Sequence, residues 1–262
     1  MILSCEVEGV GDPLVLVHGF PLDRSMWTPL VERLRERCRV FSVDLRGLGS
    51  SPLPEGEAGR VSTMEAMADD IVETLGAEGV GGAFTLAGLS MGGYVALAML
   101  ERHRARFRAV VLLDTRTAPD TPEAAQRRLE LAEAVDEAGS ARMVADLMTP
   151  RLFGPDATRD QPGLVAEWDA KMAAAPPRGV AAAARGMSAR PDRLQTLIDA
   201  QLPTLLVVGE HDVITPHDEM KGIAAAVPGS SFVAIPRSGH MPPLEQPGLC
   251  ADAIRTFLDR LA

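Results

Sequence analysis

Short runs of apolar residues alternate along this chain with stretches that have the period of an α-helix, and this alternation constrains the fold most. Each run has the length of a strand and is apolar throughout, which is typical of strands that are buried on both faces. Helix-period stretches such as 63–76 and 93–107 separate the runs. This order predicts an α/β protein with a mostly parallel central sheet flanked by helices. The runs are LVLV (14–17), VFSV (40–43), FTLAG (84–88), VVLL (110–113), TLLVV (204–208) and FVAI (232–235).

The alternation stops in one long segment, residues 117–200, which contains helical patterns but no convincing strand. The segment includes TPEAAQRRLELAEAV, SARMVADLM and GLVAEWDAKMAAA, several of them preceded by a helix start signal, and Pro176, Pro177 and Pro191 divide it. A chain of 262 residues is long enough for one large core with an insertion. We therefore expect a core formed by residues 1–116 and 201–262, with residues 117–200 as a helical lid over the sheet.

Charge and cysteine content limit the partners and the compartment. The formal net charge is −10, which disfavours nucleic acid and anionic membranes as partners because both would repel the protein. The three cysteines are far apart and have no metal-ligand spacing, so we expect free thiols and no metal site formed by them. The opening MILSCEVEG lacks the regions of a secretion signal, and no segment approaches the roughly 18 unbroken apolar residues of a membrane span. We expect a cytoplasmic protein that is a monomer or a weak homo-oligomer.

One serine stands between glycines where strand-like residues give way to helix-like ones, in LAGLSMGGYVALAML (86–100). A side chain at the tip of such a tight turn needs small neighbours two positions away, which Gly88 and Gly92 provide. The turn lifts the Ser90 hydroxyl clear of the sheet, at a helix N-terminus that favours developing negative charge. Ser90 is therefore the candidate nucleophile, and the alternative is a helix N-cap.

A serine nucleophile needs a general base, and the base needs a carboxylate that fixes its tautomer. His240 lies in a loop after the last predicted strand, at the sheet edge where such folds gather their chemistry. Asp212 lies a few residues past the strand at 204–208 and is the preferred acid. Asp114, one strand earlier, is the alternative, and an anchoring role beside Arg116 is its other interpretation. His18 belongs to another part of the site.

Backbone N–H groups must stabilise the oxyanion that forms when the serine attacks. The residue after the nucleophile, Met91, supplies one donor. The loop HGFPLD (18–23) follows the strand at 14–17, and the N–H of Phe20 is its best-placed donor. Two such donors typically lower the barrier by several kcal/mol. The other interpretation of this loop is a plain turn at the end of a strand.

These motifs resemble those of the α/β-hydrolase family over nearly the whole chain. They are VHGFPLDRSMW (17–27), VDLRGLGSS (43–51), LAGLSMGGYVA (86–96), VVGEHDVITP (207–216) and IPRSGHMPPLEQP (235–247), and they occur in that family's order. Within the family, 112–128 and 176–192 look like small bacterial carboxylesterases of the kind described from thermophilic planctomycetes. The chain is also similar to 3-oxoadipate enol-lactonases.

The resemblance implies a catalytic triad of Ser90, Asp212 and His240, with Phe20 and Met91 as oxyanion donors. It implies an α/β-hydrolase fold and a serine hydrolase that cleaves small or short-chain carboxylic esters with water, without a metal or organic cofactor. Three alternatives keep the same triad: an enol-lactone or carbon–carbon bond hydrolase, a cofactor-free perhydrolase, and a ligand receptor that turns over slowly. A basic residue in the pocket would favour the lactonase; the candidates on the lid are Arg142, Arg151, Arg178 and Arg185.

Large apolar side chains of the lid and of the loops are the candidates for substrate contact. Each of them has packing in the core as its other interpretation, and lid methionines provide an adaptable apolar surface. The candidate pocket walls are Leu22, Trp27, Met91, Phe153, Trp168, Met172, Met187 and Met241.

Overall fold

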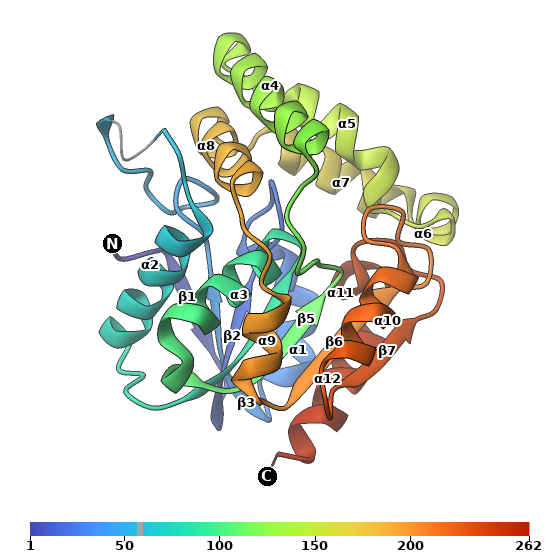
Figure 1. Cartoon of the computed structure of the whole chain (residues 1–262). Helices are drawn as coiled ribbons and strands as arrows, with labels where there is room; N and C mark the ends of the chain where they lie inside the picture. The colour runs from blue at the N-terminus through green and yellow to red at the C-terminus, as the bar shows by residue number, and fades with distance from the viewer. Residues whose placement is uncertain (57–59, 262) are drawn as a thin grey trace.

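The computed structural model describes residues 1–56 and 60–261, which form a central sheet with helices on both faces and a group of helices above one edge (Figure 1). The sheet has seven strands in the order β1-β3-β2-β4-β5-β6-β7. β1 pairs antiparallel with β3, and all other neighbouring strands are parallel. The strands are β1 (Cys5–Glu8), β2 (Asp12–Val17), β3 (Cys38–Val43), β4 (Phe84–Leu89), β5 (Phe107–Leu113), β6 (Thr204–Gly209) and β7 (Ser231–Ile235).

The central strands are buried on both faces, as their unbroken apolar runs predict. Successive side chains of a strand point to opposite faces. In β2, Val15 and Val17 belong to one hydrophobic cluster, while Leu14 and Leu16 belong to a second cluster on the other face. An apolar residue is therefore needed at every position, and the strand shows no polar alternation.

Helices of the core cover the two faces of this sheet. α1 and α12 pack together and contribute to the cluster that contains Leu14, while α2, α3 and α9 contribute to the cluster that contains Val15. The core helices are α1 (Thr28–Leu34), α2 (Met64–Ala77), α3 (Met91–His103), α9 (Leu194–Ala200), α10 (His217–Ala226), α11 (Pro242–Glu245) and α12 (Pro247–Asp259), with the 3-10 helices η1 (Arg24–Trp27) and η3 (Arg104–Arg106).

The cap helices, as we call α4–α8, lie above the carboxyl ends of the strands (Figure 1). α4 packs on α8, and α5 packs on α7. α8 packs closely on the core at Gly179, where a Cβ would lie only 1.7 Å from the carbonyl oxygen of Gly47. The cap helices are α4 (Pro122–Ala138), α5 (Arg142–Leu152), α6 (Pro155–Asp160), α7 (Pro162–Ala173) and α8 (Pro177–Ser188).

The predicted α/β-hydrolase fold is confirmed, and two details differ from the local patterns. β1 was not predicted, because this short edge strand is only partly buried and has no apolar run. α9 falls within the segment expected to form the lid, but it packs on α3 beside the sheet. The boundaries of the lid as a separate unit stay a prediction.

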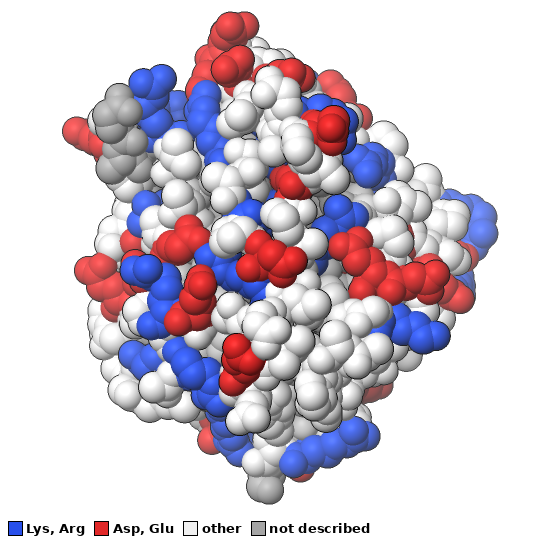
Figure 2. Space-filling view, viewed as in Figure 1, with Lys and Arg blue, Asp and Glu red and all other residues white. Residues whose placement is uncertain are grey.

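Neither the described helices nor the charges on the face drawn in Figure 2 suggest a membrane span or a surface for a polyanion. Among the described residues, no helix combines the length and the apolar character needed to cross a bilayer. Acidic and basic side chains are interspersed over the core and the cap in Figure 2, so that face offers no continuous basic surface to a polyanion.

Candidate active site

Ser90 occupies a strained turn between β4 and α3. Its backbone has φ 53° and ψ −114°, a conformation that a residue with a side chain rarely adopts. The backbone is held on both sides of the turn: the Ser90 N–H donates to Leu113 O at 2.9 Å, and the Thr115 hydroxyl donates to Ser90 O at 2.7 Å. The end of β5 and the residues after it thus hold the strained turn, and the half-buried Ser90 hydroxyl lines a cavity.

The glycines around Ser90 are required by close contacts. A Cβ on Gly88 would lie 2.3 Å from Gly92 O, and a Cβ on Gly92 would lie 2.1 Å from Val17 O. Real Cβ atoms do not approach backbone oxygens so closely, so any larger residue would force the turn open. The crowding expected across the serine is present between Gly88 and Gly92, and Gly92 also lets α3 begin against β2.

The HGFP loop lies against the serine turn. A Cβ on Gly19 would be 3.5 Å from the Ser90 Cβ, and Phe20 lines the same cavity as Ser90. His18 is fully buried: its Nδ1 donates to Gly19 O and its Nε2 accepts from Leu45 N, each at 2.9 Å. Burial lowers the pKa of His18, which favours the neutral imidazole. Its two hydrogen bonds connect the loop after β2 with the loop after β3.

His240 and Asp212 form a buried hydrogen-bonded pair from the loops after β7 and β6. His240 Nδ1 lies 2.7 Å from Asp212 Oδ2, while Asp212 Oδ1 accepts from the N–H groups of Ile214 and Thr215 at 2.7 and 3.0 Å. Burial opposes ionisation of Asp212, but the charge and hydrogen bond of His240, aided by the two backbone donors, lower the pKa of this carboxyl below its usual value. The pair is arranged to hold an imidazole with its proton on Nδ1.

The other ring nitrogen of His240 is free to accept a proton. Nε2 is buried and makes no hydrogen bond to any described residue, the Ser90 hydroxyl included. The hydrogen bond between Ser90 and His240 therefore stays a prediction, as do the oxyanion roles of the N–H groups of Phe20 and Met91.

Asp114 lies in the same buried cluster as the pair. One side-chain ligand atom from each of Asp114, Asp212 and His240 lies within 4.8 Å of the others, the one such group of potential metal ligands in residues 1–56 and 60–261. Asp114 Oδ1 accepts from the Gly209 N–H at 2.8 Å. Burial and the charge of Asp212 raise the pKa of Asp114 well above its usual value, which favours the uncharged form of this carboxyl. Among the described residues, the Asp114 side chain forms no ion pair with Arg116 and caps no helix, and its hydrogen bond from the Gly209 N–H holds the end of β6. The anchoring interpretation stays a prediction.

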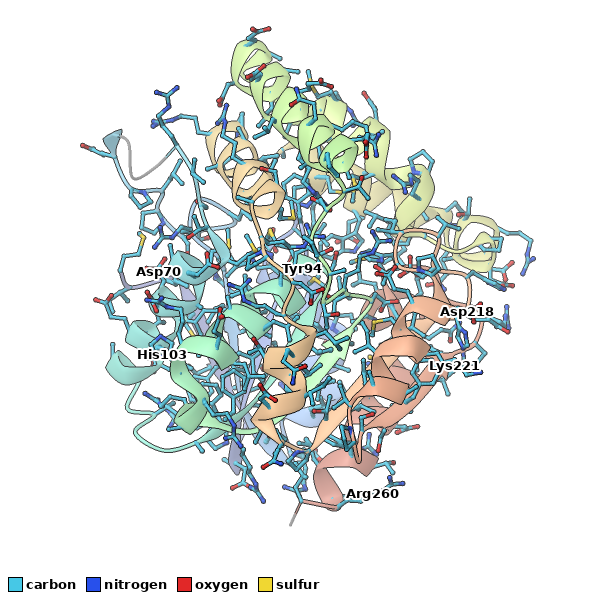
Figure 3. The ribbon with its side chains drawn as sticks, viewed as in Figure 1. Asp70, Tyr94, His103, Asp218, Lys221 and Arg260 are labelled. Atoms are coloured by element: carbon cyan, nitrogen blue, oxygen red, sulfur yellow. The ribbon has the colours of Figure 1, made fainter. Side chains whose placement is uncertain are left out.

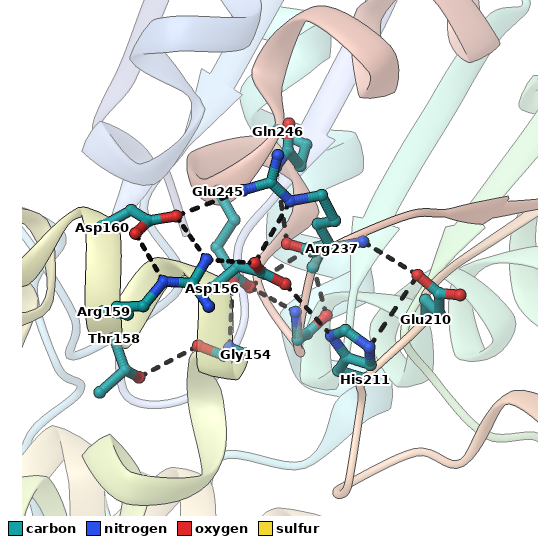
Figure 4. Close-up of polar contacts among 12 residues, drawn as sticks. Gly154, Asp156, Thr158, Arg159, Asp160, Glu210, His211, Arg237, Glu245 and Gln246 are labelled. Carbon is teal, nitrogen blue, oxygen red and sulfur yellow. Dashed lines mark hydrogen bonds and ion pairs between the residues drawn. The ribbon is translucent and has the colours of Figure 1, made fainter.

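Glu245 ties the histidine loop to the cap. Its carboxylate accepts from the N–H groups of Gly154, Gly239 and Met241 and from the Ser238 hydroxyl, at 2.8 to 3.2 Å. Figure 4 shows the contact with Gly154, at the junction of α5 and α6, beside ion pairs that join Arg237 to two aspartates of α6. Because the backbone N–H of His240 also donates to the carbonyl of Leu152 on α5, His240 is positioned by the cap as well as by the sheet.

A cavity of about 390 Å³ opens beside Ser90 and is walled by the cap. Tyr94, on the first turn of α3, lies where the cap meets the core (Figure 3) and lines this cavity together with Phe20 and Met187. Met187 is thus the one predicted wall residue in its lining. Leu22 lines a different cavity, and the remaining candidates are buried in hydrophobic clusters: Trp27, Met91, Phe153, Trp168, Met172 and Met241. Contact of these residues with a substrate stays a prediction.

Of the basic lid candidates, only Arg151 lines this cavity. Arg142 pairs with Asp169 and Asp146, Arg185 pairs with Asp136, and Arg178 is exposed elsewhere on α8. Sequence reasoning did not identify the other basic residues of the cavity, which are Arg116, Arg127 and Arg128, or the role of Glu245. For Glu245 a signal existed, because this acid is surrounded by prolines and leucine directly after the candidate base.

Comparison with known proteins supports the same assignment of fold and family. A model described as "Alpha/beta hydrolase family" matches residues 14–253. A thermophilic esterase from Thermogutta terrifontis, solved with malate bound, is 44% identical with a TM-score of 0.95, over 99% of this chain and 93% of that one. 3-oxoadipate enol-lactonase 1 of Acinetobacter baylyi is 28% identical over 94% of this chain and 88% of its own. A pimeloyl-[acyl-carrier protein] methyl ester esterase of Aeromonas hydrophila is 26% identical over 98% of this chain and 100% of its own.

Proposed function

Because this chain belongs to the alpha/beta hydrolase family, we propose that it hydrolyses carboxylic esters through an acyl-enzyme on Ser90. One observation carries the proposal: a serine in a strained turn shares the carboxyl edge of the sheet with a buried imidazole whose Nδ1 is 2.7 Å from a carboxylate and whose Nε2 has no partner among the described residues. A buried, unpartnered basic nitrogen is costly to maintain, and accepting a proton from a nucleophile gives it a function.

In the proposed reaction, His240 Nε2 takes the hydroxyl proton of Ser90 as the oxygen attacks the ester carbonyl. Asp212 holds the proton on Nδ1 and stabilises the imidazolium that forms. The alcohol leaves with the proton from Nε2, and the serine keeps the acyl group. Water, deprotonated by the same nitrogen, then releases the acid and restores Ser90.

The proposed oxyanion donors are the N–H groups of Met91 and Phe20. Met91 is the first residue of α3, so its N–H has no partner within the helix, and the helix dipole adds to its effect. Phe20 comes from the loop that packs on Ser90 through Gly19. Donors of this kind, fixed before the reaction begins, each typically contribute about 3 kcal/mol of barrier lowering.

Short-chain esters are the proposed substrates, because the cavity of about 390 Å³ is small and partly apolar. A second candidate is hydrolysis of an enol-lactone, in which the ring oxygen is the leaving group. Arg151 in the cavity lining favours it, as does the similarity to a 3-oxoadipate enol-lactonase. We also propose action in a reducing compartment, in keeping with three free cysteines.

The test is Ser90→Ala, assayed on 4-nitrophenyl acetate and butanoate. We expect kcat/KM to fall by at least about 10³-fold while circular dichroism and Tm stay those of a folded protein. Ser230→Ala is the matched control, because this half-buried serine precedes β7 at the opposite edge of the sheet. Retention of activity in Ser90→Ala would remove the proposed nucleophile. A kcat/KM for an enol-lactone a thousandfold above that for the esters would replace the esterase by the lactonase.

A further inference from the structure

Four arginines line the cavity beside Ser90, in a protein whose net charge is −10. Arg116 follows β5, Arg127 and Arg128 lie on α4, and Arg151 lies on α5. The cavity lining contains one acidic residue, Asp120. The cavity lining is therefore strongly basic.

Two of these arginines already have counterions. Arg116 pairs with Glu219 at 3.1 Å and donates to Ile214 O at 2.5 Å. Arg128 pairs with Asp120 at 2.6 Å. Because their charges are compensated and their guanidinium groups are held by the protein, these two side chains stabilise the cavity wall.

Arg127 and Arg151 have no ion pair with any residue in the described part of the chain. Both side chains are exposed, and they reach the same cavity from different cap helices. Asp120 does not compensate for them, because Arg128 and Arg190 both pair with it. The charge of Arg127 also acts on Glu123, one turn earlier on α4. Neither guanidinium group is held by an ion pair to a described residue, so both are available to bind an anion from outside the chain. Their planar fork of N–H donors matches a carboxylate.

We propose that Arg127 and Arg151 bind a carboxylate on the substrate, so that the natural substrates are esters or lactones that also carry a free carboxylate group. This inference rests on the proposed hydrolysis at Ser90 and names the substrate class of the same site. The reacting carbonyl lies at Ser90, the chain of the substrate crosses the apolar part of the cavity, and the carboxylate lies between α4 and α5.

The test compares pairs of esters that differ only in a terminal methyl or carboxylate group. The pairs are ethyl butanoate with monoethyl succinate, ethyl pentanoate with monoethyl glutarate, and ethyl hexanoate with monoethyl adipate, assayed by acid release at constant pH. An exposed charged pair contributes up to about fivefold, so two arginines together give a preference of about twentyfold in kcat/KM at the best chain length. The preference should shrink as salt is raised to about 0.5 M, since exposed charges are screened.

The variants are Arg127→Gln, Arg151→Gln and the double variant, which remove charge without breaking an ion pair to a described residue. We expect each single variant to lose part of the preference and the double variant to bring the ratio close to one. Arg178→Gln is the control, because this arginine is exposed on α8 outside the cavity lining and its replacement changes the net charge equally.

The inference is overturned if the neutral ester is hydrolysed as well as its carboxylate partner at every chain length. It is equally overturned if the preference persists in the double variant or falls as far in Arg178→Gln. These outcomes are separate from a failure of the proposed function: hydrolysis of neutral esters that depends on Ser90 upholds the nucleophile whatever the preference, whereas hydrolysis that survives Ser90→Ala removes it.

Discussion

The same substitution, aspartate to asparagine, should have very different effects on activity at Asp212 and at Asp114. We expect a large loss of kcat at Asp212 and a small change at Asp114. In Asp212→Asn the amide has one acceptor and one donor. Oδ1 already accepts from two backbone N–H groups at 2.7 and 3.0 Å, so the amide oxygen must stay there and the NH₂ group must take the place of Oδ2. In the reverse orientation the amide NH₂ group would face the N–H groups of Ile214 and Thr215. Each donor left without an acceptor would cost about 1–3 kcal/mol.

The NH₂ group then lies about 2.7 Å from His240 Nδ1. An amide nitrogen only donates, so Nδ1 must become the acceptor and the imidazole proton must move to Nε2. A protonated Nε2 has no lone pair for the proton of Ser90. The equivalent change of tautomer in a serine protease lowers kcat by about 10⁴-fold, which corresponds to about 5 kcal/mol of activation free energy.

In Asp114→Asn the same substitution is nearly isosteric and neutral. The pKa of Asp114 is raised well above its usual value by burial and by the charge of Asp212, which favours an uncharged carboxylic acid in the native protein. The amide oxygen keeps the hydrogen bond from the Gly209 N–H. The NH₂ group takes the place of Oδ2, which is buried and makes no hydrogen bond to a described residue. We expect kcat within about tenfold of the native value.

The assay is kcat and KM for 4-nitrophenyl butanoate between pH 6 and 9, with Tm measured for each variant to exclude unfolding. Nitrogen-15 shifts of the His240 ring should report the proton on Nε2 in Asp212→Asn and on Nδ1 in the native protein. If Asp114→Asn loses more activity than Asp212→Asn, the acid that serves His240 is Asp114 and the reasoning is wrong.

Four further substitutions test other contacts. Glu245→Gln sets an amide NH₂ against one of four donors that the carboxylate now satisfies, so the free energy of unfolding should fall by about 2 kcal/mol and kcat by about tenfold; a loss of stability with native kcat would reduce this residue to a structural role. Gly92→Ala should lower stability by about 3 kcal/mol or more in urea unfolding. Gly76→Ala, in open space on a helix, should raise it by up to about 1 kcal/mol, and equal effects would contradict the close-contact argument. Burial opposes ionisation of Asp120, but Arg190 and Arg128 lower its pKa below the unfolded value. Asp120→Asn should therefore lower the free energy of unfolding by about 2–3 kcal/mol at pH 7. That loss should disappear as the pH falls through the depressed pKa, below about 4, and a loss independent of pH would rule out the ion pair as its cause.

Local sequence patterns were sufficient for the architecture. The apolar runs of strand length and the helical periods between them predict the parallel sheet, because burial on both faces imposes its requirement on every residue of a strand. Gly88 and Gly92 mark the serine turn for an equally local reason, since no side chain fits two positions from Ser90. The short strand β1 escaped prediction because an edge strand is only partly buried and so its composition is weakly constrained.

The sequence by itself therefore determined the sheet, the helices and the turn that presents the serine, all of which depend on residues close together in the chain. Only the tertiary structure decided which carboxylate meets His240, that burial beside Asp212 raises the pKa of Asp114, and that Glu245 joins the histidine loop to the cap. The convergence of Arg127 and Arg151 on one cavity has the same origin. Hydrogen-bond partners, burial and local charge depend on loops that meet across the fold, and the spacing of residues along the chain does not encode those distances.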